Sequence, residues 1–406
     1  MEDFHEDILS EILSRVPRES VLNCKLVSKT WNILLSHRKL EVGILLCVAS
    51  VRERNIQLHY GYYDEIIAIT DDDHESFTYR TIEKTKHPVI NKRKVIDIMV
   101  GSCNGLVCFL VPHHRVEDPV YICNPTSGEY VNLPRINSEK GLIVSGFGYN
   151  CSANNYKVIR IHYPNKFCYN FPPSAGRVQI YTLGGGDSRG WRNLEDIDYS
   201  LAFNGTHLNG SLYWLEWLDQ KIVVFDLAEE EFRLLPPTPP CFIRAKGAYY
   251  RLAVLGGHLC FVHHKWEVGV DIWSFKSKPT DNSAAVKGYE SWSWSLDFSV
   301  PFPYLVTQSD YYKPFALTRN NEVLLWFNHT TLCCYDPKTD IFSNILVGDD
   351  ELKYLRGIPH VNSSVSLKAL GVNSKMRKYG DKVKDKSSQC ATLECKHDAA
   401  SLIKIT

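Results

Sequence analysis

The sequence predicts a mainly β protein in which a small helical unit precedes a closed β-propeller of about six blades. Three observations lead to this fold class. The first forty residues hold three short amphipathic segments with helical spacing, at 6–16, 18–26 and 28–35. After them, a polar or glycine pair followed by a hydrophobic strand recurs in steps of 50, 55, 47 and 64 residues. A second repeat, an Asx-led turn behind a strand, occurs three times in the same body.

The N-terminal segments are read as helices from the spacing of their apolar residues. In the first segment these residues fall at i, i+1, i+4, i+5 and i+8, on one stripe: Ile8, Leu9, Ile12, Leu13 and Val16. Pro17 ends this helix because it cannot continue the hydrogen-bond ladder. Ser28 is expected to cap a third helix that turns Trp31 inward. Three helices this short bury little apolar surface by themselves, so we expect a partner to cover the remainder.

This segment resembles an F-box, whose pattern contains an Ile/Leu-rich helix, Arg-Leu-Pro, a second helix and Val-Ser-Lys-x-Trp. The matching residues are Asp7, Ile8, Leu9, Glu11, Ile12, Leu13, Ser14, Arg15, Val16, Pro17, Ser20, Val21, Leu22, Cys24, Lys25, Val27, Ser28, Lys29 and Trp31. The resemblance implies that the segment binds a Skp-family adaptor through Phe4, His5, Ile8, Leu9, Ile12, Leu13, Val16, Pro17, Val21, Leu22, Lys25, Val27 and Trp31. Phe4-His5 replaces the family's Leu-Pro start, which leaves the strength of the contact open. The alternative is a mini-core that binds nothing.

The body after residue 40 is organised by the two repeats. The first consists of tight-turn pairs, each followed by a strand: Asn104-Gly105, Asn154-Asn155, Asn209-Gly210, Gly256-Gly257 and Asn320-Asn321. In the second, Asn124, Asp226 and Asp336 each follow a strand, and an aromatic residue comes six positions later, at Tyr130, Phe232 and Phe342. A turn-plus-strand unit of this length is the period of a kelch-type blade of four strands.

Five such blades can be recognised, and strands from both ends of the body supply one more. We expect strands at 43–48, 56–60 and 77–81 to join a strand at 363–370, which would leave no open edge. Six blades is the expected number, with five or seven as alternatives. The strands of the body resemble the F-box-associated domain of plant F-box proteins. The expected domains are an F-box at 1–40, a kelch-like propeller at 41–370 and a basic, disordered tail at 371–406.

Composition restricts the partners and the compartment. Lys plus Arg and Asp plus Glu both number 46, so no net field attracts nucleic acid or an anionic membrane. The sequence has no secretion-signal pattern and no apolar run long enough to span a bilayer. The 13 cysteines are an odd number in apolar surroundings, which suits a reducing compartment. We therefore expect the protein to be located in the cytoplasm, the nucleus or both.

No motif in the chain indicates catalysis, a metal or a cofactor. Gly184-Gly185-Gly186 lacks the Lys-Ser/Thr of a phosphate loop, and no nucleophile elbow or zinc-protease helix occurs. Cys390, Cys395 and His397 lack a fourth zinc ligand at standard spacing. Four tryptophans are either blade core or anchors for a bound target: Trp214, Trp217, Trp266 and Trp292. The variable loops at 164–176, 236–249 and 276–290 are the expected contact surface.

The resemblance implies a non-catalytic adaptor, the substrate-recognition subunit of an SCF-type E3 ubiquitin ligase. The F-box would dock on a Skp adaptor, which connects to a cullin and a RING protein, and the propeller would hold an unidentified target protein. Proximity would then supply the gain in ubiquitination rate. Two rival functions are an F-box/propeller interaction protein that acts without a cullin, and a propeller enzyme with facing carboxylates or a metal cluster at the axis.

Overall fold

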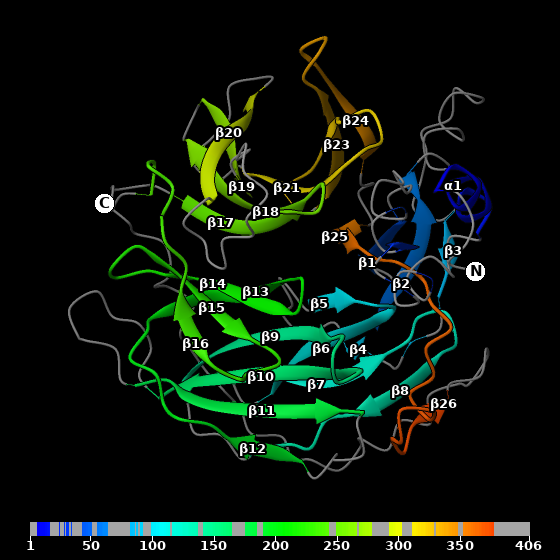
Figure 1. Ribbon diagram of the computed structural model, residues 1–406, viewed down its shortest axis with the longest axis vertical. Coiled ribbons are helices and arrows are strands. Elements are labelled where there is room, and N and C mark those ends of the chain that lie inside the picture. The colour runs from blue at the N-terminus through cyan, green and yellow to red at the C-terminus, as the bar shows by residue number, and fades with distance from the viewer. Residues whose placement is uncertain are drawn as a thin grey trace, which may run out of the picture.

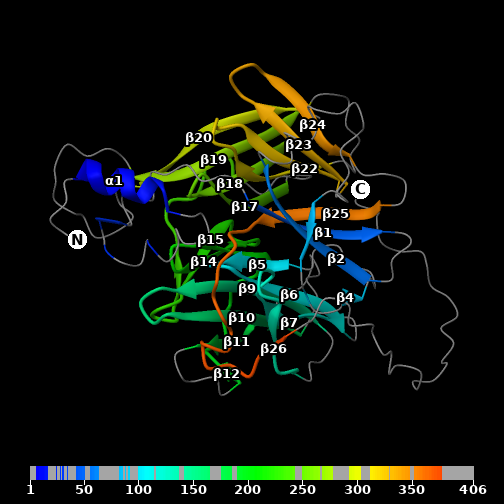
Figure 2. The ribbon, with the colours of Figure 1, turned by 90° about the vertical axis from the view of Figure 1, so that its right-hand side faces the viewer.

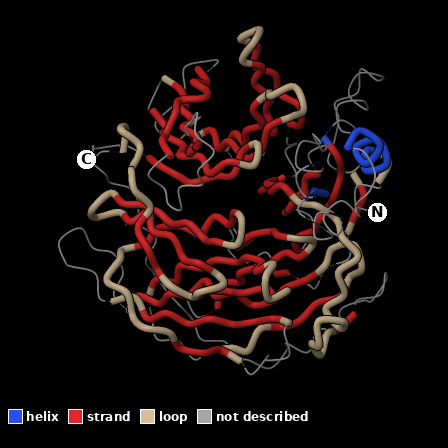
Figure 3. The backbone as a smooth tube through the Cα atoms, viewed as in Figure 1, coloured by secondary structure: helices blue, strands red, loops and turns tan. Residues whose placement is uncertain are grey.

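The computed structural model describes most of the body and part of the N-terminal segment. The described residues are 6–16, 24, 28, 30–31, 34, 43–50, 55–63, 82–85, 87, 90–91, 99–113, 116–136, 141–164, 175–184, 190–242, 249–265, 268–277, 292–302, 311–328, 330–347 and 352–376. In these residues the secondary structure is mainly strand, and the N-terminal helix α1 spans Glu6–Ser14 (Figure 3). The expected capping of a later helix is also present, because the Ser28 Oγ accepts a hydrogen bond of 3.1 Å from the Trp31 N–H.

Within the described residues, the strands form six antiparallel sheets arranged around a central axis as the blades of a propeller (Figure 1). Blade 1 contains β5 (Met99–Cys103), β6 (Leu106–His113), β7 (Val116–Cys123) and β8 (Glu129–Asn132), with β26 (Lys375–Met376) added at its outer edge. Blade 2 contains β9 (Leu142–Asn150), β10 (Asn155–Tyr163), β11 (Arg177–Leu183) and β12 (Trp191–Asn193). Blade 3 contains β13 (Leu201–Leu208), β14 (Ser211–Glu216), β15 (Lys221–Asp226) and β16 (Phe232–Leu234).

Blade 4 contains β17 (Tyr249–Leu255), β18 (His258–Lys265), β19 (Gly269–Ser277) and β20 (Trp292–Pro301). Blade 5 contains β21 (Tyr312–Leu317), β22 (Val323–Phe327), β23 (Thr331–Asp336) and β24 (Ile341–Val347). Blade 6 contains β25 (Leu352–Pro359), β1 (Gly43–Ser50), β2 (Asn55–Tyr62) and β3 (Glu83–Lys84), with β4 (Ile90–Asn91) also paired to β2. The predicted fold class, a mainly β chain with a six-bladed propeller, is confirmed.

Blade 6 closes the ring with strands from both ends of the body. Its innermost strand β25 pairs antiparallel with β1, and Leu46 lies opposite Gly357. The sequence prediction placed the closing strand at 363–370, and this is wrong because 352–359 takes the position beside β1. The carbonyls of Ser363 and Val365 instead accept hydrogen bonds from the side chain of Asn124. The expected strand at 77–81 lies outside the described residues.

The segment after β25, residues 360–376, forms a strap across blade 1. Asn124, which is fully buried, donates to the carbonyls of Ser363 and Val365 over 3.0 and 2.8 Å. The carboxylate of Glu129 accepts from the Leu367 N–H at 2.6 Å. The Leu367 side chain enters the core shared by blades 1 and 2, and the strap ends in β26 beside β8 (Figure 1). The C-terminal strap therefore joins the propeller axis to its rim.

Both sequence repeats are confirmed as turns. Asn104, Gly105, Asn209 and Gly210 have positive φ angles and join the innermost strand of a blade to the second strand. The Asx side chains open the later turns: the Oδ1 atoms of Asn124, Asp226 and Asp336 accept from backbone N–H groups two residues on, at 2.8, 2.8 and 2.9 Å. The turn residues therefore fix where each strand of a blade begins and ends, in agreement with the hydrophobic pattern of the sequence.

The two faces of the ring follow from the strand directions. Four antiparallel strands return the chain to the face where the blade began, so the innermost strands of successive blades all begin on one face. We call this the mouth face, defined by the first residues of β13, β17 and β21. The opposite face, the turn face, carries Asn104-Gly105 and Asn209-Gly210. Because β1 runs antiparallel to β25, it begins at the turn face, and Figure 2 shows α1 on that side of the ring.

Candidate partner-docking surfaces

Helix α1 divides its apolar residues between two surfaces. Leu9 and Leu13 are 4% and 1% exposed. Leu13 packs against the partly buried side chains of Val16, Cys24, Trp31 and Leu34. Ile8 and Ile12, one turn apart, are 50% and 47% exposed. The predicted single stripe is thus divided: Leu9, Leu13 and Val16 are buried or partly buried, and Ile8 and Ile12 are exposed.

The exposed pair forms an apolar ridge, Ile8 and Ile12, on the surface of α1. Residues four positions apart lie on the same helical face, so both side chains are available to a single partner. The ion pair between Arg15 and Glu11, at 2.7 Å, is exposed and contributes little to stability. The other expected Skp contacts Phe4, His5, Pro17, Val21, Leu22, Lys25 and Val27 lie outside the described residues.

The four tryptophans expected to be core or anchors lie in different environments. Trp214 on β14 is 1% exposed, and the adjacent inner strands need Gly146 and Gly205 to accommodate it, because a Cβ at either glycine would lie within 2.7 Å of its ring. The expectation that Trp214 anchors a bound target is therefore wrong: Trp214 is core and cannot touch a bound protein. Trp217 and Trp292 are partly buried against the core between blades 3 and 4. Trp266 lies outside the described residues.

The three expected contact loops do not all lie between strand ends of the same face of the ring. The connections from β10 to β11 and from β16 to β17, at 164–176 and 235–248, join strand ends on the mouth face. The connection from β19 to β20, at 278–291, joins strand ends on the turn face. Most residues of these three loops lie outside the described part of the chain. The strands that two of these three connections join therefore end and begin at the face opposite α1.

An aromatic and cationic cluster at the mouth face was missed by the sequence analysis. Phe203 on β13 is 39% exposed and has a φ angle of 63°. The guanidinium of Arg251 on β17 lies 4.5 Å from the centre of the Phe203 ring and 5.5 Å from that of Tyr249. Arg251 and Lys313 line one cleft between blades 4 and 5. The run Tyr249-Tyr250-Arg251, an aromatic and cationic start to an inner strand, was the available signal in the sequence.

One pair of polar residues on the turn face has the composition of a nucleophile and a base. Ser102 Oγ lies 2.8 Å from His360 Nδ1. Burial lowers the pKa of His360 to about 4, and a hydrogen bond from the imidazole to the Asn362 side chain opposes this shift only in part. An imidazole with this pKa is a weak base near neutral pH. The pair joins β5 to the beginning of the C-terminal strap, which accounts for its geometry.

The cysteines of blade 1 have the properties of packed thiols. Burial raises the pKa of Cys103, Cys108 and Cys123 well above the ordinary thiol value, so these thiols are protonated at neutral pH. Within the described residues, no three His, Cys, Asp or Glu side chains are grouped to hold a metal ion. Cys390, Cys395 and His397 lie outside that part of the chain.

The helical segment and the propeller together define an F-box protein. An F-box domain matches residues 1–42, and the family described as the F-box associated beta propeller domain matches residues 60–351. Since the second match covers more than half of the chain, this chain belongs to the F-box associated beta propeller family. The kelch-like character of its blades stays a prediction.

Three plant proteins similar to this chain are described as F-box proteins. F-box protein At3g07870 of Arabidopsis thaliana is 26% identical over 392 residues, covering 85% of this chain and 88% of that protein. F-box protein CPR1 of Arabidopsis thaliana is 23% identical over 394 residues, covering 86% and 85%. F-box protein At3g49450 of the same plant is 28% identical over 244 residues, covering 57% and 59%. In the part of the chain that the structure describes, no helix is long and apolar enough to cross a lipid bilayer.

Proposed function

We propose that this chain is the substrate-recognition subunit of an SCF-type E3 ubiquitin ligase. The observation that carries the proposal is the exposed apolar ridge of Ile8 and Ile12 on an F-box helix whose other apolar side chains are buried. F-box domains generally bind Skp-type adaptors. An exposed pair of isoleucines is a suitable contact for such an adaptor because its burial adds apolar area to the interface.

The proposed Skp-binding residues are the same as those expected from the sequence, but they have different roles. Ile8 and Ile12 touch the adaptor directly, and Leu9, Leu13, Val16 and Trp31 hold the helices in position from beneath. Phe4, His5, Pro17, Val21, Leu22, Lys25 and Val27 complete the proposed surface. The adaptor then links the chain to a cullin and a RING protein.

The proposed ligase needs no acid, base or nucleophile from this chain. The propeller holds an unidentified target protein, and the assembly brings lysines of the target close to the ubiquitin thioester. The rate of ubiquitination therefore increases through proximity. The domains expected from the sequence were an F-box at 1–40, a propeller at 41–370 and a basic tail at 371–406, and the last boundary is corrected because Val372 and β26 belong to blade 1. The proposed tail therefore begins after residue 376, and the proposed location is the cytoplasm, the nucleus or both. Trp217, Trp266 and Trp292 stay proposed target contacts.

The test is recovery of the Skp adaptor and the cullin with the tagged full chain from plant cells. The wild-type chain is expected to recover both proteins, and the Ile8→Asp/Ile12→Asp variant is expected to lose both, because two carboxylates would be desolvated at the interface. Ile341→Asp is the matched control, since Ile341 is also an exposed isoleucine, at 60%, and belongs to β24 of blade 5 and not to the F-box. Its recovery of both proteins is expected to equal that of the wild type.

Two outcomes decide between this function and its rival. Recovery of the adaptor without a cullin would replace the ligase with an F-box/propeller interaction protein. Equal recovery from the double variant, or from a chain lacking residues 1–40, would contradict adaptor binding through the F-box.

A further inference from the structure

We propose that the mouth of the propeller, formed by Phe203, Tyr249, Arg251 and Lys313, binds an anionic side chain, a carboxylate or a phosphate, within an extended segment of the target protein. This inference rests on the proposed function, because it names the chemistry of the target that the propeller holds. The four residues belong to β13, β17 and β21, the innermost strands of three consecutive blades. They lie near the first residues of these strands, on the face opposite α1.

The guanidinium of Arg251 is held in place before any ligand arrives. It lies 4.5 Å from the centre of the Phe203 ring, and its Nε donates a hydrogen bond to the Tyr249 hydroxyl. The Phe203 and Tyr249 rings meet edge to face at 5.9 Å. A guanidinium fixed against aromatic rings keeps its charge and presents its N–H donors in a rigid plane, which is the geometry that a carboxylate or phosphate accepts in pairs.

Phe203 holds a conformation that its own packing does not explain. Its φ angle of 63° is unfavourable for a bulky side chain, and the β13–β14 register shifts between Ala202 and Thr206. At 39% exposed, the ring recovers only part of the possible burial. Bulges and strained residues are frequent where a side chain must be directed towards a ligand. The bulge here directs Phe203 towards Arg251.

A second cation and an apolar wall lie next to this arginine. The cleft that Arg251 shares with Lys313 also contains Leu252, Val262 and Pro314. Two cations at one cleft favour an anionic group and repel a basic segment, while the apolar wall suits an aliphatic or aromatic neighbour in the bound peptide. The occupant is therefore an acidic residue adjacent to an apolar one.

The test is selection of a phage-displayed library of twelve-residue peptides on the purified full chain. We expect the recovered peptides to be enriched in Asp or Glu next to an apolar residue. A synthetic copy of the best peptide should bind the Arg251→Gln/Lys313→Gln variant at least tenfold more weakly than the wild type. Arg233→Gln is the matched control, because Arg233 is an exposed cation on the outermost strand β16. Its affinity should equal that of the wild type.

Two further variants separate recognition from folding. Arg251→Lys keeps the charge without the planar fork and should bind with intermediate affinity. Phe203→Gly removes the strain of a positive φ, so its melting temperature should be unchanged or higher while peptide affinity falls at least fivefold. A fall in melting temperature with unchanged peptide affinity would show that the cluster is structural and would overturn the proposal.

The remaining outcomes are also decisive. Recovery of neutral or basic peptides, or equal binding to the double variant, would overturn the proposal. Replacing the acidic residue of the synthetic peptide by phosphoserine identifies the source: tighter binding indicates phosphate, and weaker binding indicates carboxylate. Recovery of the Skp adaptor should be the same for every mouth variant. If the wild-type chain fails to recover the Skp adaptor but still binds the peptide, the proposed ligase function is refuted and the proposed mouth site is not.

Discussion

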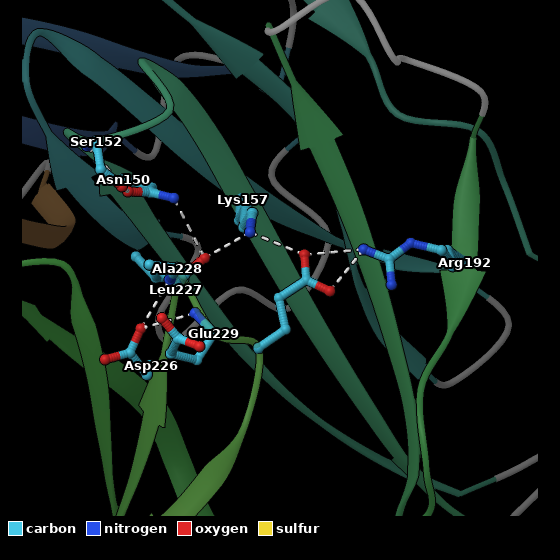
Figure 4. Close-up of polar contacts among 9 residues, drawn as sticks. Asn150, Ser152, Lys157, Arg192, Asp226, Leu227, Ala228 and Glu229 are labelled. Atoms are coloured by element: carbon cyan, nitrogen blue, oxygen red, sulfur yellow. Dashed lines mark hydrogen bonds and ion pairs between the residues drawn. The ribbon is translucent and has the colours of Figure 1, made fainter.

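The ammonium of Lys157 on β10 lies 2.8 Å from Oε1 of Glu230, in the turn between β15 and β16, so an ion pair joins blades 2 and 3. Lys157 also donates to the Leu227 carbonyl, and Arg192 on β12 donates to both oxygens of the Glu230 carboxylate at 2.8 and 2.7 Å (Figure 4). Burial by itself raises the pKa of Glu230. The hydrogen bonds from Lys157 and Arg192 outweigh it and hold that pKa below its usual value.

The two cations on this carboxylate should differ in their contribution to stability. Lys157 is almost fully buried, and Arg192 is mostly exposed. We expect Glu230→Gln to lower the free energy of unfolding by about 3 kcal/mol, because it leaves a buried ammonium without its counter-charge. Arg192→Ala should cost less than about 1 kcal/mol, since solvent screens the exposed pair. Urea unfolding of the two variants measures both values, and equal costs would contradict the assigned burial.

The C-terminal strap should be released when Asn124 loses its amide. Asn124→Asp keeps the Oδ1 atom that accepts from the Thr126 and Ser127 N–H groups but replaces the donor to the carbonyls of Ser363 and Val365 by a carboxylate oxygen. We expect a loss of about 2 to 4 kcal/mol, because one buried and one partly buried carbonyl lose their donor and face a negative charge. Limited proteolysis should then cleave within residues 361–376. Cleavage confined to other loops would show that the strap is held by other contacts.

The partly exposed turn residue Asp336 provides the control for this variant. Its Oδ1 accepts from Lys338 in an equivalent turn, and no strap crosses blade 5 in the part of the chain that is described. Asp336→Asn should therefore leave the strap protected from protease.

The sequence could predict the blades because their turns are local. Asn104-Gly105 and Asp226 specify turns through their own backbone and side chains, so residues within six positions of each other carry the information. Blade closure is different, because the pairing of Leu46 with Gly357 joins residues far apart in the chain. The sequence analysis chose 363–370 as the closing strand, whereas the ring places 352–359 beside β1.

The candidate site was predicted only in part for a similar reason. The helical spacing of Ile8 and Leu13 put both residues on one stripe, and only the packing of the neighbouring helices shows that the first is exposed and the second buried. Trp214 looked available from its residue type, whereas Gly205 on an adjacent strand makes room for its ring in the core. Phe203 and Arg251 are 48 positions apart, and no local pattern indicates their contact.

Leu13 and Ile8 should fail in different ways when each is replaced by aspartate. Leu13→Asp puts a charge into the small core around Trp31, so we expect α1 to lose its protection from hydrogen exchange and the Skp adaptor to be lost with it. Ile8→Asp should weaken adaptor recovery with α1 still protected, because the side chain faces solvent. The melting transition of the propeller should be unchanged in both. Its loss in Leu13→Asp would mean that the helices belong to the propeller core.

Native thiol labelling should separate Cys151 from the cysteines of the blade cores. Cys151 is exposed in the turn between β9 and β10, while burial raises the pKa of Cys260 to about 11 and that of Cys333 to about 12. A raised pKa and burial both reduce reaction with iodoacetamide, because the thiolate is the nucleophile. Peptide mapping after brief labelling at pH 8 should find Cys151 modified and Cys260 and Cys333 intact. Modification of the last two at the same rate would contradict their burial.

Acidification should destabilise the propeller before its carboxylates titrate. Burial lowers the pKa of His207, His264 and His360 to about 4 in each case. In the unfolded chain these groups titrate near pH 6.5, so between about pH 6.5 and 4 the unfolded state binds more protons and stability falls as pH falls, by up to about 1.4 kcal/mol per pH unit for each histidine. Urea unfolding at pH 7.5, 6.0 and 5.0 should show this decline. His207→Gln should flatten this decline. His258→Gln should change it less, because the His258 side chain is exposed and keeps more of its hydration, although burial and Lys276 lower its pKa as well. A profile level down to pH 5 would mean that these histidines are not buried as neutral groups.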